Sequence, residues 1–234
     1  MTRRITQRIL VFVVLGLAGP ASAGTIPLFS TGVDSSGAPL VGGSIDPHWV
    51  ITAGPGITSP APAFVLTNPV GFYAMSPSSS WIWVNANGIG GIGSPYSFEL
   101  TFSLTGLQAS TAVLSGMWGV DNNGSIDLNG SAATGTGGIS LTGGIEENFA
   151  VFHSFTITGG FVAGINTLDF QAEDDANPGA LNVNNLILTA TSGSVPEPSS
   201  LLMGSISLGL TGVLVAMKRL RRRVHRQSLD KLSN

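Results

Sequence analysis

Acidic side chains have the most distinctive chemistry in this sequence. Glu173, Asp174 and Asp175 follow one another, and Asp121 and Asp127 lie in an asparagine-rich segment. Carboxylate oxygens are preferred ligands of Ca²⁺, and adjacent carboxylates without a cation repel one another. We therefore expect a candidate structural Ca²⁺ site at these residues, with a solvated acidic loop as the alternative.

The segment from Asp121 to Asp127 also has a structural interpretation. It contains the first part of an EF-hand spacing, but no glutamate stands at the twelfth position. Asn123-Gly124 and Asn129-Gly130 are dipeptides typical of tight hairpin turns, because Asn and Gly accept positive φ angles. We expect a turn at each dipeptide, with Asp121 capping the first.

Three of the four tryptophans, Trp49, Trp81 and Trp83, are candidate carbohydrate contacts. Aromatic side chains present a large apolar face on which the apolar side of a pyranose ring can stack. Trp81 and Trp83 are two residues apart, so in a strand they share a face. Large aromatic residues are also typical of a hydrophobic core, and core packing remains the alternative.

The sequence contains no recognisable catalytic arrangement. Only His48 and His153 lie between residues 24 and 191, without a G-x-S-x-G or H-E-x-x-H motif. Glu146 and Glu147 are adjacent and would point to opposite faces of a strand, whereas glycoside hydrolysis needs two carboxylates at one bond. Cysteine is absent, which excludes a disulfide, a thiolate metal site and a Cys nucleophile. We expect a protein that is not an enzyme.

Charge is divided sharply along the chain. All ten Lys and Arg residues lie at the two ends, and residues 24–191 hold eleven acids and no cation, a formal charge of −11. Nucleic acid is excluded as a partner, because phosphate binding needs Lys or Arg to displace counterions. Divalent cations and backbone N–H groups are the remaining counter-charges for these carboxylates.

Short β-strands are the elements expected to position these residues. From Tyr96 to Leu104 apolar and polar residues alternate strictly, which is typical of a strand with one buried face. Between residues 24 and 191 no helix-period stretch exceeds about two turns. The pattern predicts an all-β domain, an antiparallel β-sandwich of the jelly-roll kind. The other predicted strands are Ala112–Val120, Ile126–Leu128, Phe149–Ile157, Ile165–Ala172 and Leu181–Ala190.

Residues 1–23 have the order of a secretory signal peptide: a basic start, an apolar run from Ile9 to Ala18, and a small-residue site at Ala21 and Ala23. We expect signal peptidase to cleave before Gly24. The alternative is an uncleaved membrane anchor, but ten apolar residues reach only about 15 Å as a helix.

The C-terminal end has three further parts. Residues 192–200 form a linker with Val195, Pro196, Glu197 and Pro198, residues 201–217 are uncharged, and residues 218–234 are basic. A helix of seventeen residues reaches about 26 Å, which is close to a membrane span. The positive-inside rule keeps the basic tail in the cytoplasm and places residues 24–191 outside.

The order of these parts in VPEPSSLLMGSISLGLTGVLVAMKRLRRR resembles the PEP-CTERM sorting signal, also known as an ice-binding-protein C-terminal motif. The resemblance implies that a membrane-embedded exosortase cuts near Pro196-Glu197-Pro198 and passes the ectodomain to the cell surface or extracellular matrix. The family usually ends soon after its arginines, whereas Val224–Asn234 continues here. A simple tail anchor with a proline-containing stalk is the alternative.

A second resemblance covers residues 32–189. The residues that carry it are Trp118, Asp121-Asn122, Leu128-Asn129-Gly130, Phe155, Gly164, Asn166-Thr167-Leu168 and Phe170. Their order is similar to a signature of galactose-binding-like sandwich modules found in many PEP-CTERM proteins. The resemblance implies this fold, and ligand binding varies among such modules.

Together these observations predict a non-catalytic, exported protein of the cell envelope or extracellular matrix, with exopolysaccharide as a candidate ligand. A matrix glycan hydrolase and a structural matrix component without a specific ligand are the alternatives. Convergent carboxylates in a groove would favour the hydrolase, an exposed aromatic platform would favour a lectin-like module, and the lack of both would favour the structural role.

Overall fold

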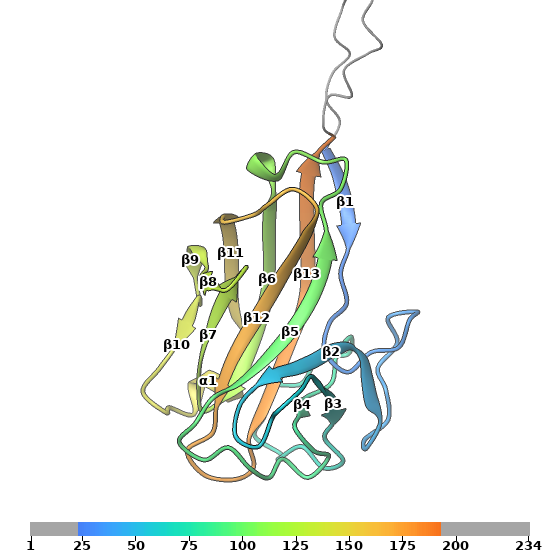
Figure 1. Cartoon of the computed structure of the whole chain (residues 1–234). Coiled ribbons are helices and arrows are strands. Elements are labelled where there is room, and N and C mark those ends of the chain that lie inside the picture. Colours follow the sequence, from blue (N-terminus) through green and yellow to red (C-terminus); the bar gives the residue numbers. More distant parts are fainter. Residues whose placement is uncertain (1–22, 193–234) are drawn as a thin grey trace, which may run out of the picture. The chain divides into compact units, whose positions relative to one another are not determined.

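The computed structural model describes residues 23–192, whose regular secondary structure is almost entirely antiparallel β-strand (Figure 1). The PEP motif at 195–198, the apolar segment 201–217, the basic tail and all of the signal peptide before Ala23 lie outside the described residues. Within the described part, no helix is long and apolar enough to cross a membrane.

Thirteen strands and two short helical turns make up the described domain. The strands are β1 (Ala23–Pro27), β2 (Ile45–Ala53), β3 (Ala61–Val65), β4 (Ile82–Trp83), β5 (Tyr96–Ser103), β6 (Val113–Asp121), β7 (Asn123–Leu128), β8 (Ser131–Ala132), β9 (Thr134–Gly137), β10 (Ser140–Leu141), β11 (His153–Gly159), β12 (Ile165–Glu173) and β13 (Ala180–Thr191). The helical turns are η1 (Ala109–Thr111) and α1 (Glu147–Ala150).

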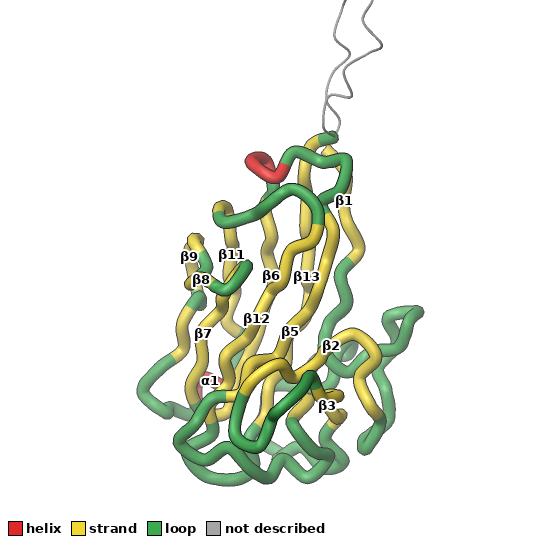
Figure 2. The backbone as a smooth tube through the Cα atoms, viewed as in Figure 1, coloured by secondary structure: helices red, strands yellow, loops and turns green. Residues whose placement is uncertain are grey.

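The strands form one hydrogen-bonded path that folds back on itself into two facing layers (Figure 2). The path runs β10-β7-β12-β5-β2-β3-β4-β13-β6-β11-β9, with β1 added to β13 and β8 added to β7. All pairings between these strands are antiparallel. The expected all-β antiparallel sandwich is therefore confirmed as an arrangement of strands.

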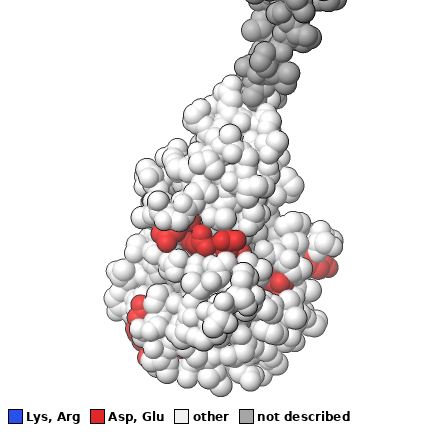
Figure 3. Space-filling view, viewed as in Figure 1, with Lys and Arg blue, Asp and Glu red and all other residues white. Residues whose placement is uncertain are grey.

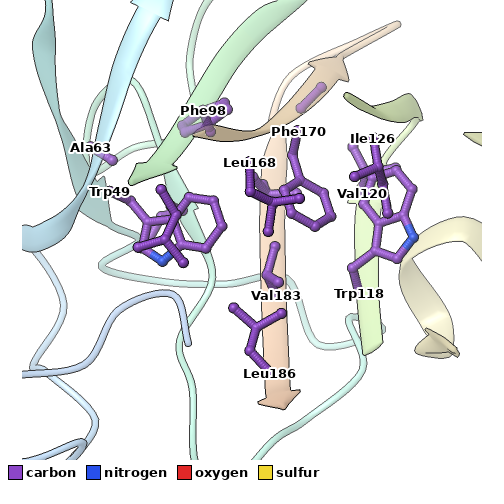
Figure 4. Close-up of a cluster of buried hydrophobic side chains, with 14 of the residues drawn as sticks. Trp49, Ala63, Phe98, Trp118, Val120, Ile126, Leu168, Phe170, Val183 and Leu186 are labelled. Carbon is purple, nitrogen blue, oxygen red and sulfur yellow. The ribbon is translucent and has the colours of Figure 1, made fainter. Parts of the chain in front are cut away.

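Aromatic rings from both layers meet in the core (Figure 4). Phe170 of β12 contacts Trp118 of β6 and Phe155 of β11 edge to face, with ring centroids 5.1 Å and 5.9 Å apart. Trp49 of β2 approaches the same ring at 5.7 Å. Full burial of one such side chain stabilises a fold by roughly 1.5–3 kcal/mol, so these contacts hold the two layers together.

The predicted strand positions agree with the structure except at residues 149–157. The first part of that range belongs to α1, and β11 begins at His153. Asn148 is buried, and its Nδ2 donates to the backbone oxygens of Asn122, at 2.7 Å, and Thr142, at 3.3 Å. Contacts with distant segments stabilise the helical turn. The alternation of apolar and polar residues in this range therefore did not predict the local structure.

One of the two predicted turns is confirmed and the other is wrong. Asn129 and Gly130 have φ angles of 54° and 73° and connect β7 to β8. Asn123-Gly124 lies inside β7 instead. A Cβ atom on Gly124 would lie within 2.4 Å of the Gln171 backbone oxygen, so this glycine permits a close approach of β12.

The two ends of the described domain lie at the same pole. Ala23 pairs with Thr191, the last residue of β13, whereas Ala180 at the start of β13 pairs with Asp121. β13 has twelve residues, which places the two poles about 40 Å apart. We call them the terminal pole and the loop pole. The described residues form one compact unit, which contains the whole of this core.

Candidate functional site

Three carboxylates lie side by side across adjacent strands. Asp169 of β12 is directly opposite Asp127 of β7 on one side and Glu99 of β5 on the other. Their neighbours Phe98, Leu168 and Ile126 are fully buried, so the acidic side chains point outward. Figure 3 shows a band of acidic side chains on this face. We call these three residues the acidic row.

Polar side chains surround the acidic row. Ser97 Oγ donates to Asp169 Oδ1 at 3.1 Å, and Gln171 Nε2 donates to Ser97 Oγ at 3.1 Å and to Asp127 Oδ2 at 3.4 Å. Thr101 Oγ1 donates to Glu99 Oε1 at 3.2 Å. These neutral groups satisfy some of the carboxylate oxygens, but like charges directly opposite one another still destabilise a sheet.

Asp169 is the most enclosed member of the acidic row, with 8% of its surface exposed. Burial raises the pKa of Asp169, the bond from Ser97 lowers it in part, and the neighbouring Glu99 and Asp127 charges raise it further. The row therefore contains one carboxyl group with a raised pKa, between two partly exposed acids.

A shallow cavity of about 320 Å³ opens beside the acidic row. Gln171, which bonds to both Asp127 and Ser97, is one of its lining residues, together with Ser125 and Glu173. Most of the lining side chains are polar, and no aromatic ring is among them. Gln171 therefore links the acidic row to the cavity.

The three candidate sugar-stacking tryptophans are core residues, which corrects that prediction. Trp49 and Trp83 have no exposed surface, and Trp81 is 4% exposed. Their indole N–H groups donate to the backbone oxygens of Phe29, Gly90 and Ala74. A sugar cannot stack on a ring that is covered on both faces. Trp81 alone lines a cavity, of about 280 Å³, with Leu40 and Met75.

The candidate calcium ligands do not all lie together: Asp121, Asp174 and Asp175 are neighbours at the loop pole, whereas Asp127 lies apart from them. Of the three consecutive acids, Asp174 is fully buried, Glu173 is half-buried and Asp175 is exposed. Asp127 belongs to the acidic row, and Asp121 lies at the end of β6. Within residues 23–192, no group of three or more His, Cys, Asp or Glu side chains is arranged to hold a metal ion. Calcium binding stays a prediction.

The two histidines of the described domain lie in different layers. His48 of β2 stacks on Phe29 with ring centroids 3.6 Å apart, and its Nε2 is 3.2 Å from the Asp34 backbone oxygen. His153 of β11 places Nε2 2.8 Å from the Glu147 backbone oxygen. Each ring makes local contacts and neither lies beside the acidic row.

Residues of the galactose-binding-like signature occupy structural positions. Trp118 fills the core and donates through Nε1 to the Gly138 oxygen at 2.6 Å. Asn129 and Asn166 bond to each other and to the loop between β11 and β12. Asp121 bonds to Tyr73 at the loop pole. The signature therefore marks residues that hold turns and loops together.

Asp127 is a candidate ligand from the sequence, whereas Asp169 and Glu99 were not predicted as its neighbours. The alternation in residues 96–104 and 165–172 indicates that both acids point outward. Their proximity depends on the register between strands that are about seventy residues apart in the chain.

Comparisons with known proteins give little information about this chain. No family model and no curated protein matches it. Among solved structures, the apo form of a cyclase from Fischerella sp. is 16% identical, covers 74% of this chain and 99% of its own, and has a TM-score of 0.43. This similarity is too low to support an inference about function.

Proposed function

We propose that this chain is an exported, non-catalytic protein of the cell envelope or extracellular matrix, and that its ectodomain binds polysaccharide at the acidic row. Signal peptidase removes residues 1–23, and segment 201–217 holds the protein in the inner membrane until exosortase cuts near Pro196-Glu197-Pro198. The order of charged, apolar and proline-rich segments supports this route.

The positions of the domain ends agree with attachment through the C-terminal tail. Ala23 and Thr191 pair at the terminal pole, so both targeting segments join the domain at the same place. The loops at the opposite pole are then about 40 Å from the attachment point. A ligand can reach the acidic row, which lies midway along β5 and β12, from the side.

The acidic row is the single observation that supports a polysaccharide ligand. Three carboxylates offer acceptors for sugar hydroxyl groups, and the partly buried Gln171 amide lies on the same surface. Charged acceptors form hydrogen bonds roughly twice as strong as neutral ones. The adjoining cavity of about 320 Å³ is large enough for one sugar ring and leaves the chain free to continue along the face.

Charge restricts the class of polysaccharide. Residues 24–191 contain eleven acids and neither Lys nor Arg, so polymers rich in uronic acid or sulfate would be repelled. Neutral polymers and polymers with free amino groups remain suitable. The amino polymers should bind more tightly, since each ammonium group can pair with a carboxylate of the row.

A glycan array probed with residues 24–191 tests this proposal directly. The single variants Glu99→Gln, Asp127→Asn and Asp169→Asn should each reduce binding at least about tenfold, because each removes one charged acceptor. Glu146→Gln is the matched variant, because it removes one exposed charge at the N-cap of α1, away from the row, and should leave binding unchanged. If no glycan on the array binds, the proposal of polysaccharide binding is wrong and the structural role without a ligand is favoured.

A glycan hydrolase is the second candidate, because two neighbouring carboxylates are also the minimum for that chemistry. Directly opposed residues on paired strands have Cβ atoms about 5 Å apart, and retaining glycosidases hold their two carboxyl groups about 5–5.5 Å apart. Asp169, whose pKa burial raises, would be the proton donor and Glu99 the nucleophile. Reducing ends released by the wild type and not by Asp169→Asn would establish hydrolysis in place of simple binding.

We also assign the sandwich to the galactose-binding-like, jelly-roll type as part of this proposal. The support is that Trp118, Asn129 and Asn166 of the sequence signature are all buried or bonded to loops of the fold. An experimental structure of a PEP-CTERM module with this signature should place the same three residue types at the same strand positions.

A further inference from the structure

Three asparagines in the chain, Asn87, Asn123 and Asn129, are each followed by a glycine. An Asn-Gly pair can rearrange without an enzyme. The backbone nitrogen of the glycine attacks Cγ of the asparagine, its proton passes through solvent to the leaving nitrogen, and ammonia departs, so a cyclic succinimide forms. Water then opens the ring at either carbonyl and produces aspartate or isoaspartate. Glycine favours this reaction because it has no Cβ atom to hinder the attack.

Hydrogen bonds hold the side chain of Asn129. Its Oδ1 accepts from the Thr167 N–H at 3.0 Å, and its Nδ2 donates to the Gly160 oxygen and to Asn166 Oδ1, each at 2.9 Å. A side-chain amide fixed in this way cannot turn its Cγ atom toward the following nitrogen until these bonds break. The reaction at Asn129 therefore requires local opening of the turn, which is infrequent in a well-bonded region.

Strands on both sides restrain Asn123. Gly124, which would supply the attacking nitrogen, pairs with Ala172 of β12 on one side and with Leu141 of β10 on the other. Oδ1 of Asn123 accepts from the Gly144 N–H at 2.8 Å. The paired strands keep the backbone extended, so the reaction at Asn123 also requires local opening.

Asn87 is much less restrained. It is exposed in the loop between β4 and β5. Within residues 23–192 its side chain makes no hydrogen bond, and its backbone N–H donates to Asn85 Oδ1 at 3.1 Å. The Gly88 N–H donates to the Asn85 backbone oxygen at 3.2 Å, which is at the long end of the ordinary range. The attacking nitrogen is therefore held weakly, and the amide that it attacks can rotate in solvent.

Gly88 is tightly packed against the loop that precedes β13. Its φ angle is 72°, and a Cβ atom there would lie 2.7 Å from Cβ of Pro178. The Gly179 N–H donates to the Gly88 oxygen at 2.8 Å. Isoaspartate inserts an extra carbon atom into the main chain directly before Gly88, whereas aspartate does not. Because the packing leaves no room for this atom, Gly88 must move away from Pro178 or from Gly179.

We propose that Asn87-Gly88 is a site of spontaneous modification, at which the folded protein slowly converts to aspartate and isoaspartate while Asn123 and Asn129 stay intact. Both products add a negative charge to a domain without Lys or Arg. Isoaspartate also loosens the contact between loops 84–95 and 174–179 at the loop pole. The modification depends neither on the export route nor on a ligand of the acidic row.

Peptide mapping after prolonged incubation of the purified protein in mildly basic buffer tests the selectivity. Residues 24–191 lack Lys and Arg, so chymotrypsin takes the place of trypsin and produces peptides 84–96 and 119–149. Replacement of an NH₂ group by an OH group raises the mass of the modified peptide, and fragmentation locates the residue and identifies isoaspartate. Conversion at Asn87 should be at least about tenfold faster than conversion at Asn123 or Asn129.

Incubation in concentrated urea is the matched control. Unfolding removes the hydrogen bonds and the strand pairing, so the three conversion rates should become similar. Asn87→Gln should abolish the product at this position, because glutamine would have to close a larger ring. Conversion in the folded protein that is as fast at Asn123 or Asn129 as at Asn87, or conversion of Asn87 in urea alone, would overturn the proposal.

Hydrogen exchange at the Gly179 amide measures the structural consequence. In the isoaspartate form, separated by chromatography, exchange at Gly179 should be at least about tenfold faster than in fresh protein, because the Gly88 oxygen has moved. Asn87→Asp adds the same charge without the extra backbone atom and should leave this exchange nearly unchanged. Equal exchange rates in the isoaspartate form and in Asn87→Asp would overturn the loosening of the two loops.

Discussion

Asn129 Nδ2 donates to Asn166 Oδ1 across 2.9 Å, and this bond joins the turn after β7 to the start of β12. Asn166 is fully buried, and its side chain also bonds to the backbone of Val162 and Gly164. Asn129 accepts from the Thr167 N–H and donates to the Gly160 oxygen. Two amide side chains therefore satisfy backbone groups in two segments that have no regular pairing of their own.

Asn166→Ala should destabilise residues 24–191 by roughly 3 kcal/mol, because it leaves several buried backbone groups without partners. For a domain of this size that corresponds to a melting temperature lower by about 6–12 °C, measurable by calorimetry. Asn68→Ala, at an exposed loop position, should change it by less than about 2 °C. Equal effects of the two substitutions would show that the Asn129–Asn166 network is dispensable.

Asp46→Asn should destabilise the domain even though burial raises the pKa of Asp46. Asp46 Oδ2 accepts from the Gly32 N–H at 2.6 Å, and Oδ1 accepts from the N–H groups of His48 and Trp49. Asparagine replaces one of these acceptors with a donor that faces an N–H group, which should lower the unfolding free energy by about 2 kcal/mol in urea titrations.

The matched variant for Asp46→Asn is Asp34→Asn. Asp34 is half-buried, and one oxygen, Oδ1, accepts from both Ser36 and Ala38. Asparagine keeps that oxygen, so stability should hardly change. If Asp34→Asn were as damaging as Asp46→Asn, loss of charge and not loss of an acceptor would be the cause.

Calcium should stabilise the ectodomain more than NaCl of equal ionic strength. Eleven carboxylates without Lys or Arg repel one another, and monovalent salt only screens that repulsion over about 8 Å at 0.15 M. A bound ion adds about 2.7 kcal/mol at a hundredfold excess over Kd. Because Ca²⁺ binds ionised carboxylates, its effect on the melting temperature should be larger at pH 8 than at pH 5. If the melting curves in CaCl₂ and in NaCl of equal ionic strength coincide at pH 8, the ectodomain has no calcium site.

The mature protein should begin at Gly24, because the Ala21 and Ala23 positions follow the apolar run at the usual distance. Cleavage there leaves Gly24–Pro27 of β1 paired with β13, so the sandwich keeps most of that edge. N-terminal sequencing of envelope protein checks the site, and a sequence that starts at Met1 or Thr2 would contradict it.

Glu197→Ala should leave the ectodomain bound to the membrane, because the apolar segment 201–217 remains while the inferred exosortase motif is lost. Fractionation of cells followed by immunoblotting measures the amount in the matrix fraction. Glu173→Ala, which also removes one carboxylate but lies inside the sandwich domain, should not change sorting. Equal release of wild type and Glu197→Ala would mean that the motif is not read in this chain.

The positions of β5, β6, β12 and β13, part of β7 and one turn could be predicted from the sequence because their causes are local, whereas β1–β4 and β8–β10 were not predicted. Alternation from Tyr96 to Leu104 follows from the period-2 geometry of a strand with one buried face, and β5 occupies that range. Asn129-Gly130 forms the expected turn because both residues accept positive φ. The same rule was wrong at Asn123-Gly124, where β12 approaches the backbone and decides the conformation.

The prediction of the targeting segments depends on the order of residues alone. The tertiary structure of residues 23–192 does not test it. The tryptophans and the acids are different, because their surroundings come from distant strands. Trp83 is buried between Tyr96 and Phe98, and Asp169 meets Glu99 and Asp127 only through strand register. Burial and register depend on which strands pair and which faces pack together, so only the tertiary structure could decide them.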